Sequence, residues 1–225
     1  MSPRCDRDRK FHTQREAMAV KDHWEQVYST RMTEKLGWYR PRLDLSLAWI
    51  DEIGLDVGDP IIDVGGGTST LIDNLIDEGF KSVTVLDISE NALKTSRKRL
   101  GRQSRDIMWL DADVTSHQLP KNQFMLWHDR AMFHFLTAEE DRLTYRANLL
   151  RTLRPGGHAI IGTFAPEAPP RCSGLPVKRY DPDHLRTELG NELVFIKEEK
   201  MLHITPGGIE QWYQFSLFSR PEPSL

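Results

Sequence analysis

Three aspartates that follow apolar runs are the residues of this sequence best suited to binding chemistry. Asp63 lies in "IIDV" just before a run of glycines, Asp87 ends "VTVLD", and Asp113 lies in "LDADV". An ionised carboxylate accepts hydrogen bonds from hydroxyl and amino groups and attracts a cationic group. Asp87 therefore suits the hydroxyls of a ribose, although it is also explained as an acid at the start of a helix. Asp113 suits an amino group such as that of adenine, and Asp63 suits the positive end of a ligand.

The glycine run Gly65–Gly67 explains how such a ligand reaches the backbone. Glycine has no Cβ and adopts positive φ freely, so a ligand can approach the turn closely. Helical spacing of apolar residues resumes at Leu71, which predicts a strand, a glycine turn and a helix. Ligands of open α/β sheets bind at such turns. A dinucleotide fingerprint is not completed, because Thr70 stands where its third glycine would be, and Asp63 would repel a pyrophosphate.

These motifs must be positioned by the elements around them, and the chain alternates β-branched runs with helical patterns. Strands are expected at residues 60–64, 82–88, 106–114, 123–130 and 158–164. Helices are expected at residues 43–53, 69–80, 89–101 and 138–157, the last ended by Pro155-Gly156-Gly157. Residues 192–220 alternate with period two around Pro206-Gly207-Gly208, as a β-hairpin does. The sequence thus predicts a Rossmann-like α/β fold, with a parallel sheet, helices on both faces and an antiparallel C-terminal hairpin.

Composition excludes several other classes of protein. The chain has 225 residues, 39% of them hydrophobic, and a formal net charge of −3, which gives no basic footprint for nucleic acid or an anionic membrane. Two cysteines far apart form no CxxC pair, so no metal site is expected. No apolar run approaches the ~18 residues of a membrane span, and acidic residues near the N-terminus argue against a transit peptide. A cytoplasmic location is expected.

One domain over residues 21–220 is expected, after a flexible tail over residues 1–20. Residues 21–57 are expected to form a helical lid. Residues 166–182 are rich in proline and are expected to form a substrate loop, because long loops over the carboxyl end of a parallel sheet are often lids.

In their order and spacing, the motifs resemble those of class I S-adenosylmethionine-dependent methyltransferases. "IIDVGGGTS" resembles the first motif of that family, with Ser69 at the position of its last glycine. "VTVLDIS" resembles the second motif, "LDADV" the third, and "LRPGGHAIIGTF" the segment after the fourth. The expected C-terminal hairpin matches the antiparallel last strand of the family. The resemblance implies the class I methyltransferase fold, S-adenosylmethionine as cofactor and S-adenosylhomocysteine as its product.

The resemblance also implies residue roles. The methionine end of the cofactor would be held by Asp63 and by the backbone at Gly65, Gly66, Gly67 and Thr68. Adenosine contacts would come from Asp87, Ile88, Asp113 and Val114. The N-terminal region is similar to that of thiopurine methyltransferases and of lysine methyltransferases acting on elongation factor 1A, which implies that the cofactor is covered by Trp24, Tyr28 and Trp38.

The acceptor is harder to assign. In "WHDRAMFHFLT", His128 has the intrinsic pKa range of a general base and Asp129 adjoins it; both are expected to border the reacting methyl group, unless His128 only packs against the cofactor and Asp129 caps the next segment. Further substrate residues are expected at Tyr39, His134, Arg171 and Cys172. Arg171 would clamp a carboxylate, whereas Cys172 is equally explained as a small buried filler.

Four functions remain open. The lysine methyltransferases usually carry D-K-G-T where this chain has Asp129-Arg130-Ala131-Met132, so a small-molecule acceptor is favoured over a protein lysine. An NAD-dependent oxidoreductase and a non-catalytic adenosyl-binding module are the remaining alternatives. Binding of NAD without S-adenosylmethionine would favour the oxidoreductase, and cofactor binding with every acceptor unmodified would favour the module.

Overall fold

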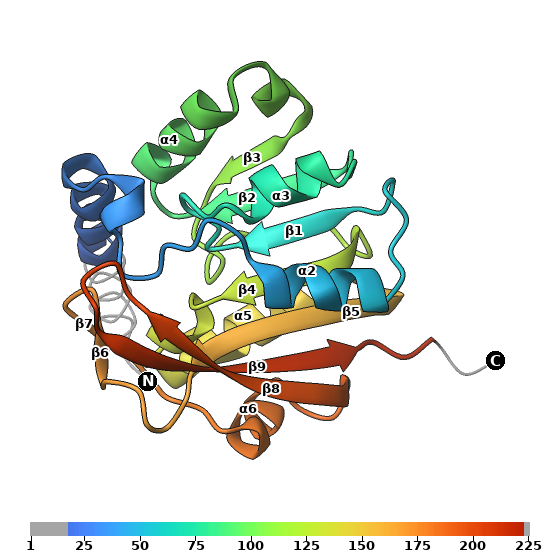
Figure 1. Ribbon diagram of the computed structural model, residues 1–225. Coiled ribbons are helices and arrows are strands. Elements are labelled where there is room, and N and C mark those ends of the chain that lie inside the picture. Colours follow the sequence, from blue (N-terminus) through green and yellow to red (C-terminus); the bar gives the residue numbers. More distant parts are fainter. Residues whose placement is uncertain (1–17, 223–225) are drawn as a thin grey trace, which may run out of the picture.

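Seven strands form a twisted sheet in the order β3-β2-β1-β4-β5-β9-β8 (Figure 1). The computed structural model describes residues 18–222. The strands are β1 Ile61–Val64, β2 Val83–Asp87, β3 Met108–Asp111, β4 Phe124–Arg130, β5 Leu153–Phe164, β8 Val194–Ile204 and β9 Glu210–Ser219. Neighbouring strands from β3 to β5 are parallel, whereas β9 is antiparallel to both β5 and β8. The predicted parallel sheet with an antiparallel C-terminal hairpin is therefore confirmed.

Helices pack on both faces of this sheet, as predicted. They are α2 Asp44–Glu52, α3 Leu71–Asp77, α4 Glu90–Leu100, α5 Glu139–Thr152 and α6 Pro182–Leu189, with short 3-10 helices η1 Thr33–Lys35, η2 Gly101–Asp106 and η3 Phe133–Phe135. One apolar core joins the sheet to α2, α3 and α4, and a second joins its other face to α5 and α6. Successive strand residues point to opposite faces, so Ile61 enters the first core and Ile62 the second.

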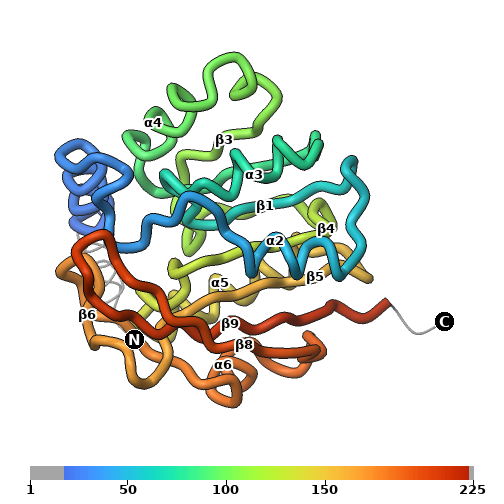
Figure 2. The backbone as a smooth tube through the Cα atoms, in the orientation of Figure 1, coloured from blue at the N-terminus to red at the C-terminus, as the bar shows by residue number. Residues whose placement is uncertain are grey.

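A further helix, described over residues 18–30, lies at the end of the sheet toward which the β1 arrow points in Figure 1, and the tube in Figure 2 shows the same helix beyond the end of β1. Residues 18–20 belong to this helix, so the expected flexible tail does not extend to residue 20. Residues 1–17 of that expected tail lie outside the described part of the chain. The helix therefore stands where the parallel strands end.

The ends of α4 follow the sequence-based expectation. The side chain of Ser89 accepts a hydrogen bond from the amide of Ala92, and Gly101 follows the helix with a φ of +57°. Serine satisfies one of the amides that a helix start leaves free, and glycine adopts a positive φ without steric cost. The helix start therefore lies directly after β2 and close to Asp87.

The end of α5 was predicted wrongly. Pro155-Gly156-Gly157 does not end α5 but lies within β5, which begins at Leu153. The segment is extended because it pairs with the chain end: Gly156 donates to the carbonyl of Arg220, and Arg220 donates to that of Gly157, both over 2.8 Å. The expected 166–182 loop contains a small ribbon formed by β6 (Arg171–Cys172) and β7 (Leu175–Pro176).

Candidate active site

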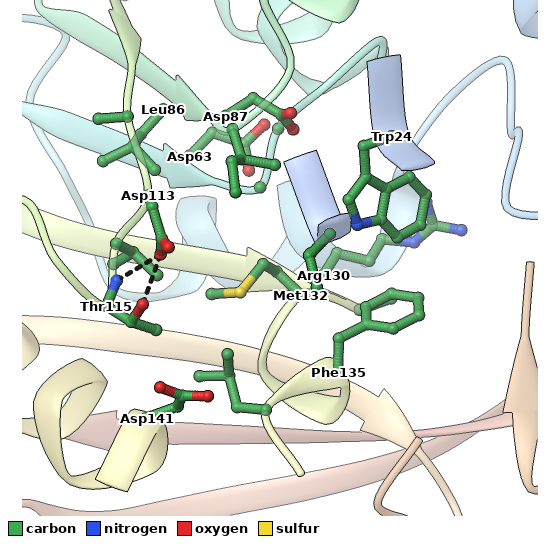
Figure 3. Close-up of a pocket in the computed structure, with 18 of the residues that line it drawn as sticks. Trp24, Asp63, Leu86, Asp87, Asp113, Thr115, Arg130, Met132, Phe135 and Asp141 are labelled. Carbon is green, nitrogen blue, oxygen red and sulfur yellow. Dashed lines mark hydrogen bonds between the residues drawn. The ribbon is translucent and has the colours of Figure 1, made fainter. Parts of the chain in front are cut away.

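A cavity of about 700 Å³ lies at the carboxyl ends of β1 to β4 (Figure 3). Its wall is completed by segments distant in sequence: the helix over residues 18–30, the start of α5, β6 and β9. Of the residues expected to bind cofactor or substrate, the cavity is lined by Trp24, Tyr28, Trp38, Asp63, Gly65, Gly66, Asp87, Ile88, Asp113, Val114 and Cys172. The cavity thus brings together residues that are up to 148 positions apart, counting from 24 to 172.

The parallel register explains why the three aspartates meet. Asp63 on β1 pairs with Val85 on β2, and Asp87 at the end of β2 pairs with Asp111 on β3. The chain leaves all three strands at the same edge of the sheet. Asp113 follows two residues after β3 ends, and it faces the same cavity as Asp63 and Asp87 (Figure 3).

The glycine turn after β1 is crowded from both sides. Gly65 has a φ of +66°, and a Cβ there would lie 2.5 Å from Cβ of Met132. A Cβ on Gly66 would lie 2.7 Å from Oδ2 of Asp63. The turn therefore needs glycine, and Gly65 and Gly66 present bare backbone to the cavity.

Two residues expected in this cradle lie behind it. Gly67 does not line the cavity; a Cβ there would collide with the hydroxyl of Tyr28, so glycine lets the N-terminal helix approach. Thr68 is buried, its hydroxyl has no hydrogen-bond partner, and it does not line the cavity. Both residues stand behind the cavity wall, so their contact with a ligand stays a prediction.

Asp87 is a buried acid held at the cavity wall. The amide of Ser89 donates to its Oδ1 over 2.8 Å. Burial raises the pKa of Asp87 to about 7, against the lowering effect of hydrogen bonds from the amides of Ser89 and Gly67. A ligand that donates hydroxyl hydrogens to this carboxylate would favour its ionised form.

Asp113 is oriented by its own turn. The amide and the hydroxyl of Thr115 both donate to Oδ1, over 2.8 Å and 2.6 Å (Figure 3). Both bonds end on the same oxygen, which leaves Oδ2 to accept from a ligand. The neighbouring Val114 is buried and lines the cavity with Ile88, so an acid and apolar walls stand side by side.

His128 does not fit the expected role of general base. It is fully buried and does not line the cavity. Its Nδ1 donates to Oδ1 of Asp63 over 2.7 Å, and its Nε2 lies 2.9 Å from Oγ of Ser46. Both ring nitrogens are thus engaged. His128 fixes the carboxylate of Asp63 from behind, and Oδ2 of Asp63 is left without a partner at the cavity wall.

Asp129 is also a structural residue in this arrangement. Oδ1 accepts from the amide of Met132 over 2.8 Å, and Oδ2 accepts from the hydroxyl of Tyr145 over 2.8 Å and from the amide of Phe133 over 3.1 Å. Burial raises its pKa to about 6. The alternative expectation, that Asp129 caps the segment after β4, is the one that the geometry supports.

Most of the expected substrate residues lie outside the cavity. His134 is fully buried, its Nδ1 accepts from the amide of Phe164 over 3.1 Å, and burial lowers its pKa to about 3. Arg171 is exposed and donates to the carbonyl of Gly174 over 2.7 Å. Tyr39 lines a separate small recess. Cys172 does line the cavity, but burial raises the pKa of its thiol to about 11.

The structure adds residues that sequence reasoning missed, among them Arg130, Met132, Phe135 and Tyr213. Phe135 packs edge-on against Trp24, with ring centroids 5.0 Å apart. Residues just after β4 had a detectable signal, because they follow a buried strand at the binding edge. Tyr213 had none: it reaches the cavity only because β9 pairs with β5, placing Tyr213 beside Phe164.

The helix over residues 18–30 is tied to the edge of the cavity by charged side chains. The carboxylate of Glu25 accepts from the hydroxyl of Ser89 and from the amides of Glu90 and Asn91, over 2.7–3.1 Å. Lys21 donates to Asp111 over 2.8 Å. Glu25 thus satisfies free amides at the start of α4, and the helix brings Trp24 and Tyr28 over the cavity.

Comparisons with known proteins agree with this fold. The family model for a methyltransferase domain matches residues 61–157. The eEF1A lysine and N-terminal methyltransferase homolog of Drosophila melanogaster is 28% identical over 65% of this chain and 22% of its own length. The eEF1A lysine and N-terminal methyltransferase of Mus musculus is 26% identical over 64% of this chain and 21% of its own length. The chain thus spans about a fifth of the length of these curated relatives.

A solved S-adenosylmethionine-dependent methyltransferase from Anabaena variabilis superposes with a TM-score of 0.69, at 13% identity, over 91% of this chain and 94% of the other. It shows that the two proteins share a fold. The strand-end motifs, the sheet order and the domain match over residues 61–157 together support a class I S-adenosylmethionine-dependent methyltransferase.

Within residues 18–222, no helix is long and apolar enough to cross a membrane. The same residues contain no group of three or more His, Cys, Asp or Glu side chains that could hold a metal ion.

Proposed function

We propose that this methyltransferase acts on a nitrogen acceptor, and that a primary amine of a protein, on a lysine side chain or at the N-terminus, is the first candidate. The observation that carries the proposal is the cavity itself. It extends from the strand-end aspartates to an aromatic region formed by Trp24, Tyr28, Trp38 and Phe135. Lysine and N-terminal methylation are named for the curated relatives. They support a protein amine better than the small molecule that the sequence favoured.

The residues on the cofactor side fit S-adenosylmethionine, which supplies an activated methyl group on a sulfonium when bound. Oδ2 of Asp63 has no partner and would accept from the ammonium of the methionine end. The bare turn at Gly65 and Gly66 leaves room for that end. Asp87 and Asp113 would accept from the ribose hydroxyls and the adenine amino group. This assignment uses only side chains already placed at the cavity wall.

The aromatic region of the cavity suits an amine. Trp24, Trp38, Tyr28 and Phe135 form a contiguous aromatic group, with Trp24 at its centre. Aromatic faces attract ammonium groups and exclude water. Orientation of the acceptor amine against the methyl group, together with water exclusion, would then supply much of the catalysis.

The acceptor amine must reach the reacting position as a free base. His128 and His134 are buried away from the cavity and do not remove its proton. Burial raises the pKa of Tyr28 well above its ordinary value, so its hydroxyl stays neutral at physiological pH. The hydroxyl lies against Gly67 at the glycine turn, so it does not remove the proton of the amine either.

A small amine is the second candidate, and one observation favours it. The helix over residues 18–30 covers the cavity and is held there by Glu25 and Lys21. A small molecule is enclosed more easily beneath this helix than a residue of a folded protein. The missing D-K-G-T sequence points in the same direction.

The test is a methylation assay with S-adenosylmethionine labelled in its methyl group. Acceptors would be an elongation factor 1A protein, lysine-containing peptides with free and with acetylated N-termini, and a panel of small amines, thiols and phenols. Label transfer to amines, strongly reduced in the Asp87→Ala variant when the cofactor is below saturation, is the expected result. Transfer confined to thiols or phenols would refute the nitrogen acceptor and leave the methyltransferase assignment intact.

A further inference from the structure

Arg130, the last residue of β4, is a cation in the cavity wall with few partners. Its Nη2 donates to the carbonyl of Trp38 over 2.9 Å, and its Nε is shielded from solvent without a partner. Within the described part of the chain, Arg130 forms no ion pair with a carboxylate. A guanidinium offers five N–H donors, and a shielded donor without a partner is costly. The cavity side of Arg130 therefore calls for an anion.

Tyr213 on β9 adds a second donor at the same place. Its ring lies 5.5 Å from Cζ of Arg130, measured to the ring centroid, and both side chains line the cavity. Its hydroxyl is buried and has no hydrogen-bond partner. Burial raises the pKa of Tyr213, so the hydroxyl keeps its proton and can donate. An anion at this place would meet the guanidinium and a phenolic hydroxyl together.

The sheet order assigns this pair of donors to the acceptor side. The three strand-end aspartates belong to β3, β2 and β1, and β4 comes next on the far side of β1. β9 lies further along, beyond β5. Arg130 extends away from Asp63 and Asp87 toward Trp24 (Figure 3). A cofactor held by the aspartates therefore ends near β1, and the space before Arg130 belongs to the second substrate.

Resting on the proposed function, we infer that Arg130 and Tyr213 bind a carboxylate carried by the methyl acceptor. A planar carboxylate matches two parallel N–H donors of a guanidinium. The aromatic side chains Trp24 and Phe135 nearby would hold the apolar part of the acceptor. The carboxylate is either that of a small amino acid or that of an acidic or C-terminal residue of a protein, and both present the same chemistry.

A binding experiment tests this site without requiring turnover. The Nε–H signal of Arg130, identified by its loss in Arg130→Lys, would be followed by nitrogen-15 NMR while benzoate is added; benzamide and inorganic phosphate serve as controls. We expect a saturable shift with benzoate and none with benzamide. No shift with benzoate, or a stronger response to phosphate, would overturn the carboxylate site. Methyl transfer is not needed for this result, so it stands apart from the proposed function.

A set of variants separates the acceptor from the cofactor. Arg130→Lys, Arg130→Gln and Tyr213→Phe should keep S-adenosylhomocysteine affinity within about twofold. The ratio of turnover with an acceptor acid to turnover with its amide should fall at least tenfold in these variants. The fall should be smallest in Arg130→Lys, which keeps the positive charge. Arg171→Gln, an exposed arginine outside the cavity, is the matched control. A loss of S-adenosylhomocysteine affinity equal to the loss of turnover would overturn the inference, because Arg130 would then serve the cofactor.

The two sources of carboxylate are separated by the acceptors used. Small amino acids and their amides form one arm, and peptides with free or amidated C-termini and with Glu or Gln beside the methylated residue form the other. Preference for the acid form in either arm supports the site and identifies the source. Equal turnover of acid and amide forms in both arms would overturn it.

Discussion

The two halves of the cavity are built differently. On the proposed cofactor side, Asp87 ends β2 and Asp113 follows β3, and each carboxylate is held by the amide two residues further on. On the proposed acceptor side, Arg130 and Tyr213 come from strands separated by β5 and carry donors without partners. The first half is organised by local chain geometry and the second by contacts between distant segments. Binding of the shared cofactor can therefore be encoded in short motifs, whereas acceptor choice cannot.

The largest effect that would sharpen this comparison is expected at Gly66. A side chain there would lie 2.7 Å from Oδ2 of Asp63 and 2.8 Å from Cγ1 of Val85, so Gly66→Val must displace the carboxylate or the strand. We expect S-adenosylhomocysteine affinity to fall more than about 100-fold, or ~2.8 kcal/mol. Calorimetry measures it, with Gly58→Ala as the control, because a Cβ at Gly58 meets no atom within 4 Å. Near-normal binding by a folded Gly66→Val would contradict the cradle.

Asp87→Ala is expected to have the next largest effect. The substitution removes an acceptor whose hydrogen bonds to ligand hydroxyls involve a charged group, worth about 1.5–3 kcal/mol. The dissociation constant for S-adenosylhomocysteine should rise by about 10- to 150-fold. Adenine alone should lose little affinity, because the proposed contact to the base is made by Asp113. Equal losses for both ligands would show that Asp87 supports the whole loop rather than the ribose.

The pKa of Asp87 predicts a pH dependence. Burial raises this pKa to about 7 in the free protein, and ligand hydroxyls favour the ionised form. Affinity for S-adenosylhomocysteine should therefore rise with pH, by up to about tenfold per unit below pH 7, and binding should release a proton. Titrations at pH 6, 7 and 8 in buffers of different ionisation enthalpy measure both. A pH-independent affinity would show that the ribose hydroxyls of the ligand do not bind to Asp87.

The same pKa fixes the sign of the effect of Asp87 on folding. The pKa of Asp87 in the folded protein lies above its unfolded value of about 4. The contribution of Asp87 to the free energy of unfolding is therefore complete below pH 4 and is lost as the pH rises through 7. Asp87→Asn should lose less stability than the parent protein between pH 5 and 8, as measured by denaturant unfolding. The difference between the two proteins removes the contribution of Asp129, whose pKa is also raised.

A smaller effect on turnover is expected at His128. His128→Phe removes the hydrogen bond to Asp63, so the free energy of unfolding should fall by about 1.5–3 kcal/mol. At saturating cofactor and acceptor, turnover should fall less than tenfold, and the pH profile should keep its shape. A large loss of turnover in a stably folded variant would restore His128 as the base.

The smallest effect is expected at Arg171. Its side chain is exposed, outside the cavity, and bonded to the carbonyl of its own turn at Gly174. Arg171→Gln should leave cofactor affinity and turnover within about twofold of the parent. A selective rise in the KM of the acceptor would show that the β6–β7 ribbon contributes to the acceptor site, and would contradict an acceptor site formed by Arg130 and Tyr213.

The sequence predicted which residues meet at the ends of the parallel strands, for a physical reason. Parallel strands end at a common edge, so the aspartates within "IIDV", "VTVLD" and "LDADV" had to meet once the strands were assigned. Helix α6 was missed even though Asp181 caps it, Pro182 begins it and Gly190 follows it. Its short pattern was obscured by the proline-rich segment before it.

The acceptor half was predicted poorly because its residues are placed by tertiary contacts. His128 looked like a base from its position after a strand, but the alternation of side chains along β4 turns it toward Ser46 and Asp63 beneath the sheet edge. Arg130, two residues later, ends the strand at the cavity. Tyr213 depends on the pairing of β9 with β5, which no local pattern specifies.

The most direct test is a calorimetric titration of the protein with S-adenosylmethionine and S-adenosylhomocysteine, with NAD as the control. The strand-end aspartates and the glycine turn predict saturable binding of the first two ligands and none of NAD. Binding of NAD alone, or of no ligand, would contradict the assignment of Asp63, Asp87 and Asp113 to an adenosyl sulfonium, and the acceptor site built beside them would fall with it.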